Sequence, residues 1–88
     1  MKFNCDRVNH ANINTTSAVA MTVITALQDY PPEEQAIGLA AVFRMFTEVH
    51  PIDLHDLFTV VDNMLTRAEP KDLRPIEAVL DYMKGELA

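Results

Sequence analysis

The sequence predicts an all-α fold: a compact bundle of about four short antiparallel helices that follows an irregular N-terminal arm over residues 1–13. The first observation is the placement of proline, a residue that interrupts helices. Three proline clusters divide the chain into four segments: Pro31-Pro32, Pro51, and Pro70 with Pro75. The second is that each segment has apolar residues at helical spacing, with no Asn-Gly or Asp-Gly turn and no sustained apolar/polar alternation. The third is that the linkers are short, which favours antiparallel neighbours.

The first predicted helix covers about residues 15–29. Asn, Thr or Ser at positions 14–16 would cap its free amides, and the pair Pro31-Pro32 cannot continue it beyond Tyr30. Its unusual feature is that no Asp, Glu, Lys or Arg occurs between Val8 and Gln28. Because a helix without a charged side is usually covered on most sides, we expect this one to be covered by other protein.

The second predicted helix covers residues 32–49 and begins at the second proline of the pair, a residue type that suits the first turn. Glu33 and Glu34 place negative charge at the positive end of its dipole. Arg44 and Glu48, four positions apart, mark its solvent side. Its middle carries small residues that allow another backbone to approach closely: Gly38, Ala40 and Ala41.

The third and fourth predicted helices cover about residues 53–68 and 73–87. Asp53 and Asp72 are the expected N-caps, and Pro75 falls in the first turn of the last helix. Both segments carry an apolar stripe opposite a polar side, which is typical of ordinary helices buried on one side.

Length and charge bound the classes of function. A chain of 88 residues is expected to form one domain, residues 1–88, with one modest core. Apolar residues make up 49% of it, which predicts a folded protein, and 13 acidic against 7 basic side chains give a formal charge of −6. A negative chain repels phosphate backbones, so direct nucleic-acid binding is not expected.

Charge is unevenly distributed along the chain. Residues 8–43 hold 3 charged side chains in 36 positions, whereas residues 44–88 hold 14 in 45. The first two helices therefore form either the centre of the bundle or a contact with another chain. We favour the contact, because helices 3 and 4 offer too little surface to enclose helices 1 and 2. The expected self-association interface comprises Val19, Val23, Ile24, Leu27, Ile37, Ala40 and Ala41.

The main hypothesis is thus a non-catalytic helical protein–protein interaction module that forms a homodimer or higher homo-oligomer and contacts another protein as well. Light scattering at micromolar concentration should detect the oligomer. Val23→Glu or Ala40→Glu is expected to disrupt it, and Asp62→Lys is not.

An acidic side of helices 3 and 4 supports a different hypothesis, a monomeric adaptor or inhibitor that binds a basic protein surface. The residues expected on this acidic partner face are Asp56, Asp62, Glu77 and Asp81. Such binding would weaken steeply as salt is added.

A third hypothesis is a small metal-binding protein that uses His50, Asp53 and His55. Helical metal pairs are spaced i, i+3 or i, i+4, and Pro51 interrupts the helix between the two histidines, so a capping role at a helix–helix corner is the favoured interpretation. No glycine-rich loop or nucleophile motif accompanies the acidic residues. We therefore expect no catalytic residue, no resident metal and no cofactor.

Cysteine usage and the N-terminus indicate the compartment. The only cysteine, Cys5, cannot form a disulfide within the chain, and charged and Asn residues interrupt the N-terminus where a signal peptide would be apolar. The most apolar stretch, residues 18–27, is about half as long as a membrane crossing. We expect a cytoplasmic protein that does not enter membranes.

Overall fold

The computed structural model describes residues 3–87, and it confirms the all-α helical bundle. Within that range no strand occurs. In chain order, the elements are α1 (Cys5–Asn9), α2 (Ile13–Leu27), α3 (Pro32–Val49), α4 (Leu54–Arg67), a 3₁₀ turn (Pro70–Leu73) and α5 (Arg74–Glu86).

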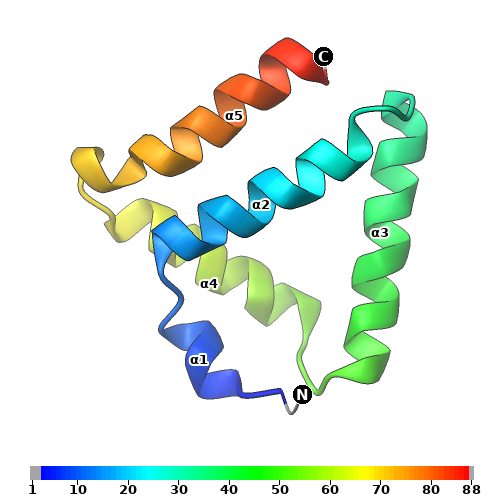
Figure 1. The fold of residues 1–88 in the computed structure, drawn as a ribbon. Coiled ribbons are helices and arrows are strands. Elements are labelled where there is room, and N and C mark those ends of the chain that lie inside the picture. The colour runs from blue at the N-terminus through cyan, green and yellow to red at the C-terminus, as the bar shows by residue number, and fades with distance from the viewer. Residues whose placement is uncertain (1–2, 88) are drawn as a thin grey trace.

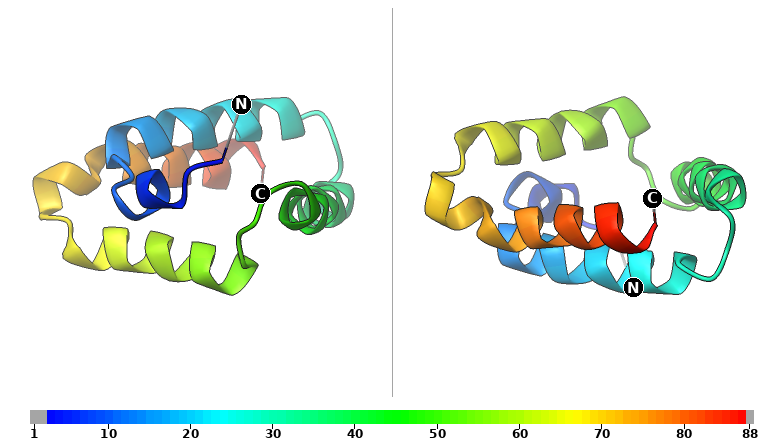
Figure 2. Two further views of the ribbon diagram at one scale, coloured as in Figure 1. Left: turned by 90° about the horizontal axis from the view of Figure 1, so that it is seen from below. Right: turned by 90° about the horizontal axis from the view of Figure 1, so that it is seen from above.

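The helices are arranged around the pair α2 and α5, which lie side by side and run in the same direction (Figure 1). Helix α4 runs opposite to both, and the short α1 packs against it. Helix α3 crosses one end of the molecule, where Figure 2 shows it end-on beside the other helices. The bundle is therefore built on α2, α4 and α5, with α3 at its edge.

The small core lies where α2 meets α5. Ile24 of α2 and Val79 of α5 are the buried apolar residues within the described range. Ser17 is also buried, and its Oγ donates a hydrogen bond to the Ile13 carbonyl one turn earlier, at 2.7 Å. That bond satisfies the hydroxyl inside the core.

Helices α2 and α4 each begin at an Asn or Asp whose side chain accepts from two backbone amides. Asp53 caps α4 as expected, since its carboxylate accepts from the amides of His55 and Asp56. Helix α2 begins earlier than expected because Asn12 is its cap, and Asn12 Oδ1 accepts from the amide of Asn14 at 2.8 Å. The α2 helix also ends earlier, at Leu27.

Helix α3 begins at Pro32, as predicted, with Glu33 and Glu34 in its first turn. Its predicted ion pair is present: Arg44 Nη1 and Glu48 Oε1 are 2.9 Å apart on an exposed side. Gln35 is the buried residue of this helix. Its Nε2 donates to the carbonyls of Leu27 and Tyr30 at 3.0 and 2.7 Å, which ties α3 to the end of α2.

Two local expectations are corrected. Asp72 does not cap the last helix, because residues 70–73 form a 3₁₀ turn and α5 starts at Arg74 without a side-chain cap. Pro75 does occupy the first turn of α5. The N-terminal arm contains a short helix, α1, started by Asn4, whose side chain accepts from the amide of Asp6.

Candidate interaction surface

Helix α3 is sparsely covered by the rest of the described chain. The extensive helix–helix contacts within residues 3–87 join α2 to α5 and α1 to α4, and α3 takes part in neither. One side of α3 faces the molecule, where Leu39, Phe43 and Thr47 are half-buried. The ring of Phe43 meets that of Phe58 edge to face, with centroids 6.0 Å apart. This contact and the Gln35 bonds hold α3 in place and leave its remaining sides open.

The seven residues predicted for self-association fall into two groups. Ile24 is buried in the core of the chain itself and Leu27 is half-buried, so both stabilise the fold in this structure. The others are exposed: Val19, Val23, Ile37, Ala40 and Ala41. Neither α2 nor α3 is enclosed as the centre of a bundle, since each exposes most of its residues.

Sequence reasoning missed an exposed apolar stripe on α3. The stripe comprises Gly38, Val42, Met45 and Val49, and we call it the α3 seam. Val42 and Met45 are each 55% exposed and Val49 is 73% exposed. The signal in the sequence is the 4-3-4 spacing of these positions, which places them along one side of a helix. The same spacing places Val19, Val23 and Tyr30, all exposed, along one side of α2 and its following turn.

The predicted Ala40 lies on a different side of α3 from the seam. It lines a groove of about 540 Å³ between α3 and α4, together with Phe43, Ile52 and Phe58. Phe58 is 50% exposed there, so the groove has an apolar wall.

A second apolar groove, of about 340 Å³, lies over the core between α2, α4 and α5. Ile24, Leu65 and Val79 line its floor, and Leu80 and Met83 stand exposed beside them. The apolar stripe of α5 is therefore wider than its contact with α2.

The acidic residues predicted on α4 and α5 are all exposed: Asp56, Asp62, Glu77 and Asp81. None of these four takes part in an ion pair within the described residues. Their position permits contact with a basic surface and equally permits simple solvation.

The structure does not gather His50, Asp53 and His55 into a ligand set. The Asp53 carboxylate is used by the α4 cap, and the His50 ring lies against Phe3 and Phe46, with centroids 5.0 and 4.5 Å away. Among residues 3–87, no group of three or more His, Cys, Asp or Glu side chains is placed to hold a metal ion. The metal-binding hypothesis therefore gains no support from the geometry.

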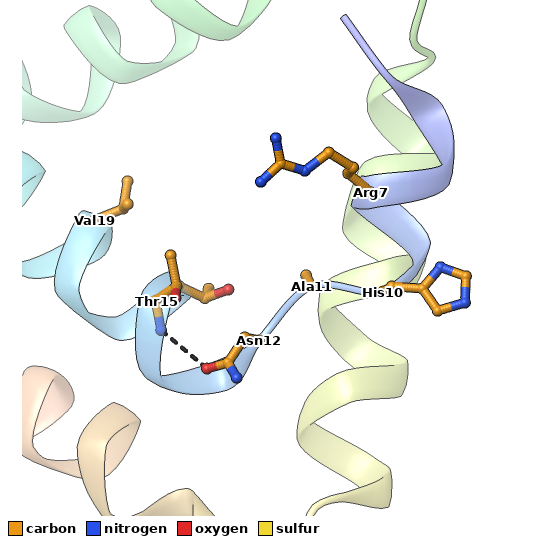
Figure 3. Close-up of a pocket in the computed structure, with 7 residues that line it drawn as sticks. Arg7, His10, Ala11, Asn12, Thr15 and Val19 are labelled. Carbon is orange, nitrogen blue, oxygen red and sulfur yellow. Dashed lines mark hydrogen bonds between the residues drawn. The ribbon is translucent and has the colours of Figure 1, made fainter.

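A further concave feature is the hollow between α1 and the start of α2 (Figure 3). Its volume is about 500 Å³, and Arg7 extends into it from α1 while His10 points away. The first amides of α2 are already capped by Asn12, as the dashed line to Thr15 in Figure 3 shows. One arginine beside a capped helix end does not make an anion site.

The solvent-accessible surface area of the chain is larger than expected for a folded monomer of its mass. The chain exposes 6861 Å², about 1,700 Å² more than the roughly 5,200 Å² expected for a folded monomer of 9.9 kDa. Within residues 3–87, large apolar residues contribute to this excess because they are exposed: Val19, Val23, Tyr30, Ile37, Val42, Met45, Phe46, Val49, Phe58, Leu80 and Met83.

Comparison with known proteins adds no functional assignment. No protein-family model matches the sequence, and neither a curated protein nor a solved structure matches the chain. Within the described residues, every helix is too short or too polar to cross a membrane.

Proposed function

We propose that this protein is a non-catalytic helical interaction module that self-associates through the exposed sides of α2 and α3. The observation that carries the proposal is the surface excess of about 1,700 Å² combined with its apolar character. A standard protein–protein interface takes about 800 Å² from each partner. The excess is therefore about twice what each copy contributes to a stable dimer.

The scarcity of charge supports the same proposal. Helices α2 and α3 hold only Glu33, Glu34, Arg44 and Glu48 as charged residues. Depletion of charge at the centre of an interface is typical of protein–protein contacts.

Light scattering coupled to size-exclusion chromatography at micromolar concentration tests the proposal. We expect a mass of at least twice 9.9 kDa for the native chain. Val23→Glu, at an exposed apolar position of α2, should lower that mass, because a carboxylate would be buried against an apolar partner. Asp62→Lys is the control on exposed α4 and should leave the mass unchanged. A native chain that stays at 9.9 kDa would refute self-association.

The second candidate function is binding of a basic protein by the exposed side chains of Asp56, Asp62, Glu77 and Asp81. Their lack of ion pairs within residues 3–87 is the observation that favours it. In that case Asp62→Lys would weaken capture of the basic partner, and capture would fall steeply with added salt.

The cytoplasm is the compartment that we propose for this activity. Cys5 is a free, exposed thiol, which a reducing compartment keeps unoxidised.

A further inference from the structure

The α3 seam is an apolar surface that residues 3–87 leave uncovered. The seam residues Gly38, Val42, Met45 and Val49 recur at 4-3-4 spacing, the pattern by which two helices pack along a shared line. A Cβ placed on Gly38 would meet no atom within 4 Å, so open space borders the helix backbone at that point. Figure 2 shows α3 at one end of the molecule, where a second helix can approach it without crossing the bundle.

We propose that the occupant of the α3 seam is the α3 seam of a second copy, packed antiparallel across a two-fold axis. This inference rests on the proposed self-association and names the contact that produces it. A two-fold interface uses the same surface on both copies, so the seam must be complementary to itself.

Side-chain size favours the antiparallel arrangement. With the axis at the middle of the seam, Gly38 of one copy lies opposite Val49 of the other, and Val42 lies opposite Met45. Each small residue thus meets a larger one, which fills the space between the helices evenly. A parallel pair would place Gly38 against Gly38 and Met45 against Met45, and would leave a gap at one end.

Charge favours the same arrangement. Glu34 lies beside the seam at the start of α3, one turn before Gly38. A parallel pair would bring the two Glu34 carboxylates together, whereas an antiparallel pair separates them by the length of the seam. The opposed helix dipoles of an antiparallel pair also attract.

Surface area is sufficient for such a dimer. The surface excess of the whole chain, about 1,700 Å², exceeds the roughly 800 Å² that each partner contributes to a standard interface. The exposed apolar side of α2, which carries Val19 and Val23, supplies further surface beyond the seam.

Glutamate substitutions on two sides of α3 test the location of the contact. Val42→Glu and Met45→Glu, at seam positions, should reduce the mass measured by light scattering from twice 9.9 kDa to 9.9 kDa. Ala40→Glu is the matched control, because Ala40 is exposed on the same helix but lies about 160° around it from both Gly38 and Val42. In contrast to the expectation from the sequence, Ala40→Glu should remain dimeric, because Ala40 lines the groove between α3 and α4 and not the α3 seam. Far-ultraviolet circular dichroism checks that each variant keeps its helices.

Disulfide trapping in a Cys5→Ser background tests the direction of the pair. A Gly38→Cys/Val49→Cys double variant should form a covalent dimer on mild oxidation, because positions 38 and 49 of different copies are opposite each other. Val49→Cys alone should remain uncrosslinked, since two residues at position 49 would be about 16 Å apart along an antiparallel pair. A disulfide needs Cα atoms within about 7 Å.

The outcomes separate the two proposals. A native chain that is monomeric at every concentration tested overturns both. A native dimer that persists in Val42→Glu but dissociates in Val23→Glu overturns the α3 seam and leaves self-association through α2. A native dimer lost in Ala40→Glu but kept in Val42→Glu moves the contact to the α3–α4 groove and also overturns the seam. Efficient crosslinking of Val49→Cys alone overturns the antiparallel direction.

Discussion

Gln35 joins α2 to α3, and its replacement by methionine should destabilise the protein by about 2 kcal/mol. Gln35 is 8% exposed, and its Nε2 donates to the carbonyls of Leu27 and Tyr30. Methionine has a similar length and no donor, so Gln35→Met removes both hydrogen bonds while largely keeping the volume. Each bond contributes about 1 kcal/mol net, which gives the sum. The Leu27 carbonyl still accepts from the Tyr30 amide, whereas the Tyr30 carbonyl loses the bond from Gln35.

Urea unfolding followed by circular dichroism, at one fixed protein concentration, measures the change. For a domain of this size, 2 kcal/mol corresponds to a melting temperature lower by roughly 8–16 °C. Ala36→Met is the matched control, because it adds the same side chain at the next, exposed position of α3 and should change stability by less than about 0.5 kcal/mol. A Gln35→Met variant as stable as this control would refute the role assigned to the two hydrogen bonds.

Two further predictions concern the cap and the core. Asp53→Ala should lower the free energy of unfolding by about 1 kcal/mol because it removes the α4 cap. Asp53→Asn should retain most of the stability, because its side-chain oxygen can still accept from the free amides. Thermal melts measure both variants, and equal loss of stability in the two would contradict the capping role of Asp53. Val79→Ala removes two buried methyl groups from the core at 5% exposure and should cost about 2 kcal/mol, transfer and cavity together. Urea unfolding measures it, and a loss below about 0.5 kcal/mol would show that Val79 is not in a packed core.

The helix boundaries were largely predictable because local chemistry determines them. Pro32 and Asp53 mark the starts of α3 and α4 whatever surrounds them. The cap of α2 was misplaced because Asn12 and Asn14 both precede the same apolar segment, and either could accept the free amides. The short α1 was missed because five residues are too few to show a helical period.

The uncovered side of α3 could not be predicted from spacing alone. Periodicity shows which residues share a side of a helix, but not which neighbouring helix covers that side. Ala40 and Ala41 drew attention as small residues, and the structure places Ala40 in the groove beside Phe58. Val42 and Val49 fit helical spacing equally well, and only the three-dimensional arrangement shows that they lack a partner within residues 3–87.

The apolar arc on α3 is only partly covered by the rest of the described chain. From Met45 around to Phe43, apolar positions span about 160° of the helix, wider than the roughly 100° stripe that one core contact requires. The part of the arc that carries Leu39 and Phe43 faces the molecule, and the part that carries the α3 seam does not. A change confined to the seam should therefore alter assembly while sparing the fold, whereas a change at Gln35 should alter both, because Gln35 fixes the direction in which α3 presents the seam.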